Sequence, residues 1–234
     1  MGAGRRPGDD LRRLPDGDAL PLTAAEPDDG SDTVWYASYG SNLCADRFGC
    51  YLAGGLPRGA AHPCRGARDA TPPREDRPLD IPHRLYFAGT SKTWGGAPCF
   101  IDTVEDATTP THARAYLITW GQFEDVVAQE NGHRATPPID RALHGLAAGT
   151  GQRIGPGRYE HLLCVGRLDD VPVLTFTSPS TMDDAGLAAP APAYLSLLVD
   201  GLRESHRLRD DALVTYLGSA PGCSTELAAS ALTR

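Results

Sequence analysis

The segment from Val34 to Leu43 constrains the fold of this chain more than any other, with the sequence VWYASYGSNL. Its first half is apolar and aromatic, which predicts a buried β-strand. Gly40, Ser41 and Asn42 then predict a tight turn into a helix. Glycine lets the backbone approach a ligand closely, and a serine or asparagine side chain can serve as the N-cap.

The junction between this strand and the following helix is a candidate anion site. A helix begins with unpaired N–H groups and a partial positive charge, which the strand would direct at a carboxylate or phosphate. The helix is expected to continue through Phe48 and Leu52 and to stop at Gly54. Such junctions are also common without a ligand, so the spacing alone leaves both interpretations open.

Composition narrows the classes of function. The chain has 234 residues, 41% of them hydrophobic, and a formal net charge of −8, which argues against a nucleic-acid partner. No apolar run is long enough to span a bilayer, and no hydrophobic segment follows Arg5-Arg6 to make an export signal. The six cysteines form no C-x-x-C pair, which favours a reducing, cytoplasmic location and argues against structural zinc.

Three segments are expected along the chain. Residues 1–31 are rich in Gly, Pro, Asp and Arg and predict a flexible tail. Residues 32–218 contain no linker and predict one domain, and residues 219–234 form a C-terminal extension. The sequence leaves the oligomeric state open.

The order of predicted elements indicates an α+β fold with a mixed β-sheet, curled into a partial or closed small barrel with flanking helices. Pro57 to His83 is dense in Pro, Gly and Arg and is expected to be irregular, either a functional loop or a solvated one. The other expected strands are 85–88, 98–102, 113–119, 159–166 and 171–177, the last two as a hairpin turning at Asp169-Asp170. The other expected helices are 121–131, 193–208 and 211–217.

The helix after Thr119 places a carboxylate on its apolar face. Thr119 and Gln122 fit a capping box. Glu130 lies seven residues after Phe123 and so returns to the same stripe, whereas Glu124 and Asp125 are expected to point into solvent. Burial raises the pKa of a carboxyl group towards the range useful for proton transfer. Alternatively, Glu130 lies where the helix frays and reaches water or an arginine.

Four segments together resemble the γ-glutamylcyclotransferase-like family. Tyr39 to Leu43 reads YGSNL, which the family carries after its first strand. Ser91 to Ala97 is similar to the family's S-x-T-W-x-G-G loop, with one residue missing between Trp94 and Gly95. Pro192 to Leu195, which contains Tyr194, resembles the C-terminal P-S-x-x-Y segment, and Glu130 lies where the family carries its catalytic glutamate.

The resemblance implies cleavage of a small-molecule γ-glutamyl amide. The substrate's α-amine attacks its own γ-carbonyl, closes 5-oxoproline and expels an amine, with no metal or organic cofactor. Glu130 would be the general acid and base. The substrate-binding residues implied are Tyr39, Gly40, Ser41, Asn42, Leu43, Trp94, Gly95 and Tyr194. Tyr39 and Tyr194 could equally pack in a core, and the leaving amine is not specified.

Other chemistries have weaker sequence support. The seven histidines show no H-E-x-x-H spacing, and no G-x-S-x-G elbow is present. Cys44 near a helix N-terminus is an alternative nucleophile, with an expected lowered pKa. Two further hypotheses remain: an amide hydrolase or acyl-transfer enzyme that uses Glu130, and a binding protein without catalysis.

Overall fold

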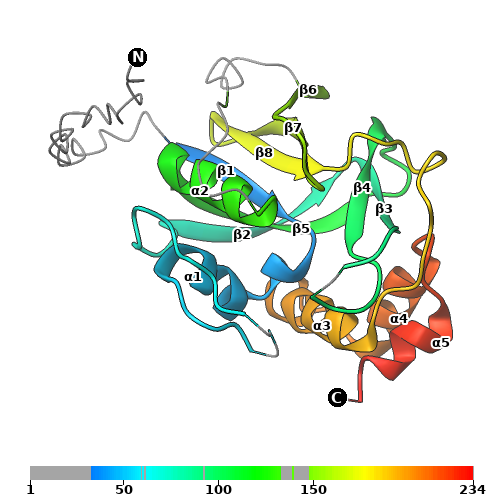
Figure 1. The fold of residues 1–234 in the computed structure, drawn as a ribbon. Coiled ribbons are helices and arrows are strands. Elements are labelled where there is room, and N and C mark those ends of the chain that lie inside the picture. The colour runs from blue at the N-terminus through cyan, green and yellow to red at the C-terminus, as the bar shows by residue number, and fades with distance from the viewer. Residues whose placement is uncertain are drawn as a thin grey trace, which may run out of the picture.

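A six-stranded mixed β-sheet forms the centre of the molecule (Figure 1). The computed structural model describes residues 33–58, 60, 62–91, 93–132, 139 and 148–233, so the tail predicted at residues 1–31 lies outside the described residues. The strand order is β2-β5-β1-β8-β7-β6, in which β1 pairs antiparallel with β5 and parallel with β8. The strands are β1 (Thr33–Ser38), β2 (Glu75–Ile81), β5 (Thr111–Thr119), β6 (Thr150–Arg153), β7 (His161–Leu168) and β8 (Val171–Thr177).

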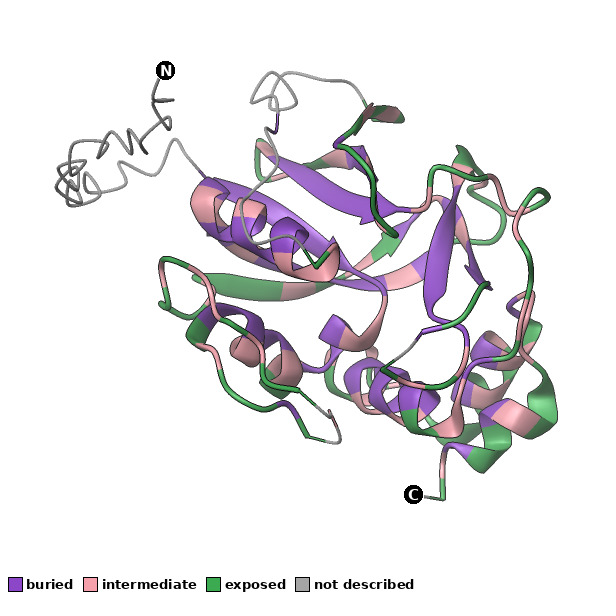
Figure 2. Ribbon diagram, in the orientation of Figure 1, coloured by how far each residue is buried: buried purple, intermediate pink, exposed green. Residues whose placement is uncertain are grey.

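Helices cover both faces of this sheet. Every residue of β1 is buried, as expected for a central strand with cover on both sides (Figure 2). Trp35 and Ala37 join the core under the C-terminal helices, whereas Val34 and Tyr36 join the core on the other face. The first core contains residues of α3 (Pro192–His206), α4 (Asp210–Ser219) and α5 (Thr225–Ser230), and the second those of α1 (Ala45–Ala53) and α2 (Trp120–Glu130).

A separate two-stranded antiparallel ladder lies at one end of the sheet and is hydrogen-bonded to two of its strands. It consists of β3 (His83–Phe87) and β4 (Cys99–Glu105). Thr177 of β8 exchanges two hydrogen bonds with the backbone of Ile101, at 2.6 and 3.2 Å, and Thr111 of β5 donates to the His83 carbonyl. The α+β class with a mixed, partly curled sheet is therefore confirmed, but among the described strands the sheet stays open.

Two predicted features of the chain between strands have different outcomes. The turn at Asp169-Asp170 is confirmed, with φ of 50° and 62°, the left-handed pair that a tight hairpin requires. The prediction that Pro57 to His83 is irregular is wrong in part, because β2 occupies Glu75–Ile81. Its sequence contains Pro78 and mostly exposed residues, which an edge strand tolerates and which hide the strand pattern.

The last helix, α5, was not expected from the sequence. Ser224 caps it by accepting a hydrogen bond from the Leu227 N–H at 3.2 Å. Ala228 in α5 and Ala231 just after it are buried in the same core as α3 and α4. Figure 1 shows α3, α4 and α5 gathered at one end of the molecule. No helix in the described part of the chain is long and apolar enough to cross a membrane.

Candidate active site

The turn after β1 forms a short 3₁₀ helix, η1 (Ser41–Leu43), before α1 begins. The expectation that Ser41 or Asn42 caps the helix is wrong, because Cys44 occupies the N-cap position of α1 and neither side chain caps η1. Both polar side chains have other partners. Ser41 Oγ accepts from Arg47 Nε at 2.8 Å, and Asn42 Nδ2 donates to Glu130 Oε1 at 2.9 Å.

Two glycines allow close packing around η1. A Cβ on Gly40 would lie 3.3 Å from both Cys99 Sγ and the Tyr194 hydroxyl. A Cβ on Gly201 of α3 would lie only 2.4 Å from the Cβ of Leu43 and 2.5 Å from its carbonyl carbon. Helix α3 therefore packs directly on η1 and fixes the position from which Asn42 reaches Glu130.

Glu130 is the last residue of α2 and lies at the end of its buried stripe. The predicted capping box of Thr119 and Gln122 is present at the start of this helix. Phe123 and Val127 are fully buried, and Glu130 is half-buried. The helix thus presents one carboxylate to the η1 turn.

Burial raises the pKa of Glu130 above that of an ordinary glutamate. Arg47, hydrogen bonds from Tyr51 and Asn42, and Arg158 oppose this effect by favouring the charged form. A carboxyl group with a raised pKa and several donors around it is suited to accept a proton and return it.

Glu130 lies where two cavities meet. The inner cavity has a volume of about 30 Å³, which suits one water-sized group, and Gly40, Ser41 and Asn42 line it. The outer cavity has about 360 Å³, enough for a small molecule. Ser41, Glu130, Tyr159 and Tyr194 line both cavities.

Arg47 is a site residue that sequence reasoning missed. Its guanidinium lies 5.7 Å from the ring centre of Tyr51 and 5.2 Å from that of Trp94, at the outer cavity. Its Nη1 is buried and has no hydrogen-bond partner among the described residues. The available signal was the i, i+4 spacing of Arg47 and Tyr51, which places both on one face of the predicted helix.

Asn42 contains a second unpaired polar atom in the site. Its Oδ1 is buried without a hydrogen-bond partner in the described structure, while its Nδ2 contacts both Glu130 and the Tyr36 hydroxyl. Buried polar atoms are nearly always paired, and exceptions call for an explanation. Here an acceptor on Asn42 and a donor on Arg47 flank one carboxylate.

The other residues predicted for the site take different places. The hydroxyl of Tyr39 donates to the Phe176 carbonyl at 2.7 Å, and that of Tyr194 contacts Cys99 Sγ at 3.1 Å, although both rings line the inner cavity. Trp94 lines the outer cavity. Gly95 is exposed and lines neither cavity.

Leu43 does not offer a backbone donor to a ligand. Its N–H donates to the Gly40 carbonyl at 2.9 Å, and its side chain is buried in the core with α3. Because the first N–H groups of a helix lack acceptors within it, Ser41 and Asn42 provide the remaining backbone donors of the turn.

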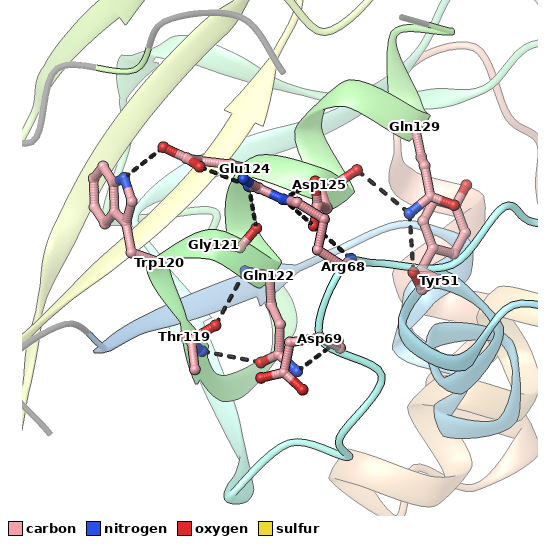
Figure 3. A network of polar contacts seen from close by, with 10 residues as sticks. All are labelled: Tyr51, Arg68, Asp69, Thr119, Trp120, Gly121, Gln122, Glu124, Asp125 and Gln129. Atoms are coloured by element: carbon pink, nitrogen blue, oxygen red, sulfur yellow. Dashed lines mark hydrogen bonds and ion pairs between the residues drawn. The ribbon is translucent and has the colours of Figure 1, made fainter. Parts of the chain in front are cut away.

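Two acids of α2 expected to be solvated lie in a separate polar network (Figure 3). Asp125 is 5% exposed and accepts from the backbone N–H of Arg68 at 2.8 Å and from its Nε. Glu124 accepts from Arg68 Nη2 at 2.9 Å and from the Trp120 indole. The expectation was wrong because a distant loop packs over this face of the helix, which helical periodicity cannot indicate.

The network also ties α2 to α1. Gln129 Nε2 donates to the Tyr51 carbonyl at 2.9 Å and to that of Asp125 (Figure 3). This bond joins the residue before Glu130 to the helix that holds Arg47. The arginines of the segment from Pro57 to His83 all have partners within the protein. They are Arg58, Arg65, Arg68, Arg74 and Arg77.

The expected low pKa of Cys44 is wrong. Burial raises the pKa of this thiol, and Glu204 adds to the effect although the backbone opposes it. Burial likewise raises the pKa of Cys99 to about 12. Neither thiol is activated as a nucleophile.

The known proteins that this chain is similar to include one sequence relative and two solved structures. Histone deacetylase 5 of Arabidopsis thaliana is 34% identical over 201 residues, so the match covers 80% of this chain but only 30% of the relative's length. A gamma-glutamyl cyclotransferase structure has a TM-score of 0.45 at 15% identity, with 74% of this chain and 80% of that chain covered. An uncharacterized protein from Homo sapiens has a TM-score of 0.44 at 14% identity, with the same coverage. No family model matches the chain.

Proposed function

We propose that this chain cleaves a γ-glutamyl amide of a small molecule by intramolecular cyclisation, releasing 5-oxoproline and a free amine. The observation that supports this most is the 2.9 Å contact between Asn42 Nδ2 and Glu130 Oε1 at the junction of the two cavities. It places an acid with a raised pKa against the turn that resembles the YGSNL signature.

The reaction moves two protons from the α-nitrogen of the substrate to the nitrogen of the departing amine. The Glu130 carboxylate takes a proton from the α-ammonium, and the freed amine attacks the γ-carbonyl carbon to form a five-membered ring. The protonated Glu130 then delivers that proton to the amide nitrogen as the carbon–nitrogen bond breaks. The regenerated carboxylate takes the second proton from the ring nitrogen, which becomes the neutral lactam N–H, and passes it to the released amine. The N–H groups of Ser41 and Asn42 stabilise the oxyanion that forms between the two steps.

The unpaired atoms of the site match the polar groups of a glutamyl head. Asn42 Oδ1 is an acceptor for the α-ammonium, and Arg47 Nη1 is a donor for the α-carboxylate. The outer cavity of about 360 Å³ leaves room for the amine that departs. When Asn42 and Arg47 hold the glutamyl group in a folded conformation, its amine lies close to its γ-carbonyl, which lowers the entropic part of the activation barrier.

Product analysis separates the three activities that this site could support. The 234-residue chain is incubated with γ-glutamyl amides of several amines, and with an acetyl-lysine peptide because the Arabidopsis relative is named a histone deacetylase. We expect 5-oxoproline and free amine in equal amounts. Free glutamate instead would indicate a hydrolase, and acetate would indicate a deacylase. Binding without any product would indicate a protein without catalysis.

A further inference from the structure

A second polar cluster lies on the face of the sheet that α3 covers. It consists of Asp80 on β2, His112 on β5 and His206 at the end of α3. One ligand atom of each residue lies within 4.8 Å of the others. None of the three lines the cavities around Glu130. The cluster therefore belongs to a different site.

Hydrogen bonds fix which nitrogen of His206 carries the proton. The Ser205 hydroxyl donates to the Gly201 carbonyl at 2.7 Å, so its oxygen must accept from His206 Nδ1 at 2.9 Å. In the neutral ring this leaves Nε2 with a lone pair.

The Nε2 lone pair faces a carboxylate. His206 has a side chain only 10% exposed, and its Nε2 lies 3.7 Å from Asp80 Oδ1. Within the described residues this nitrogen has no hydrogen-bond partner. In the neutral ring the Nε2 lone pair and the carboxylate repel one another, and a cation bound by both removes this repulsion.

His112 completes the donor set from the neighbouring strand. Its Nδ1 lies 2.6 Å from the same Asp80 oxygen. Its backbone N–H donates to the Tyr216 hydroxyl at 3.0 Å, and the two rings are 4.5 Å apart, which fixes the position of His112. Two imidazoles and one carboxylate form the ligand set of zinc and related divalent transition metals rather than of magnesium or calcium.

We propose that Asp80, His112 and His206 bind a divalent transition-metal ion of the zinc type. Binding at His112 Nδ1 requires the tautomer of this ring in which Nε2 carries the proton, so that Nδ1 offers its lone pair to the ion. A water completes the coordination on the side of Asp80, which is 55% exposed. The ion joins the edge strand β2 to β5 and to the end of α3, and it stabilises the folded protein.

Cobalt and zinc titrations of the EDTA-treated 234-residue chain test this site. Co²⁺ reports the ligand type, because thiolates give an intense near-ultraviolet band that nitrogen and oxygen ligands lack. We expect one equivalent of Co²⁺ without this band. We also expect Zn²⁺ at about 100 times its Kd to raise Tm by about 5–10 °C.

Matched variants make the test decisive. Asp80→Asn and His206→Gln should each abolish both signals, while His62→Ala, an exposed histidine outside the cluster, should leave them unchanged. Circular dichroism checks that each variant is folded, and Asp80→Asn is nearly isosteric. A thiolate band, no uptake, or uptake that survives both substitutions would overturn the proposal.

Discussion

Helix α2 has acidic residues near its start and at its end, and an arginine lies close to each group. The two groups differ in whether the hydrogen-bonding atoms of that arginine have partners within the protein. Near the start of α2, Glu124 and Asp125 are paired with Arg68, whose guanidinium has acceptors on several sides (Figure 3). At its end, Glu130 lies near Arg47, yet Arg47 Nη1 has no partner in the described chain. The hydrogen bonds of Arg68 with Glu124 and Asp125 are formed within the protein and stabilise the fold. Arg47, near Glu130, keeps a buried donor that a ligand can bind, as expected of a binding site.

The largest expected effect comes from the acid at the end of α2. Glu130→Gln should lower kcat/KM for 5-oxoproline formation by about 10²–10⁴-fold, because an amide cannot transfer the proton. Glu124→Gln is the matched control, with the same change on the same helix, and should leave kcat/KM within about twofold of the unmodified protein. Steady-state kinetics on both variants check this. Equal losses of kcat/KM in the two variants would contradict a catalytic role that belongs to Glu130 and not to Glu124.

The two arginines should respond oppositely to one substitution. Arg47→Gln should raise KM by about 10–100-fold, because a charged hydrogen bond to the substrate carboxylate is lost. Arg68→Gln should leave KM unchanged but lower the free energy of unfolding by about 1–3 kcal/mol, since the buried Asp125 carboxylate loses its guanidinium partner and keeps the hydrogen bond from the backbone N–H of residue 68. Kinetics and urea denaturation of both proteins measure this pair. The comparison fails if Arg47→Gln affects only stability.

A smaller effect, on stability alone, is expected where helix α3 packs on η1. Gly201→Ala should lower the free energy of unfolding by about 1–3 kcal/mol, because the new methyl group overlaps Leu43. Gly49→Ala in α1 is the control, since its Cβ meets nothing within 4 Å. Alanine there should stabilise the protein by about 0.5–1 kcal/mol. Similar denaturation curves for the two variants would contradict the close packing of α3 on η1.

The smallest expected effect is a shift in pH dependence. Because Glu130 must be ionised to accept a proton, kcat/KM should fall as pH drops through its raised pKa. Arg47 favours the charged form, so Arg47→Gln should move this acid limb to higher pH. A limb at the ordinary pKa of glutamate in both proteins would contradict the assignment.

The same raised pKa sets the sign of a stability effect. The unfolded chain ionises Glu130 at a lower pH than the folded protein does. Stability should therefore fall as pH rises from the ordinary glutamate pKa to the raised one. Glu130→Gln should remove this loss, which urea denaturation across that window would show.

Local sequence pattern predicted those parts of the site that depend on one element. The first strand, the capping box at Thr119 and the stripe that ends at Glu130 all follow from periodicity and capping chemistry. The burial of Asp125 could not follow from periodicity, because it depends on Arg68, 57 positions away. Strand β2 was missed because its Pro78 and exposed residues resemble a loop. The unpaired state of Arg47 is likewise a tertiary property.

A crystal structure of Glu130→Gln with an uncleaved γ-glutamyl amide would test the central claim most directly. We predict the α-amine within hydrogen-bond distance of the residue 130 side chain and of Asn42 Oδ1, with the α-carboxylate on Arg47. A ligand bound away from the junction of the two cavities, or a glutamyl head turned away from residue 130, would contradict the proposed cyclisation.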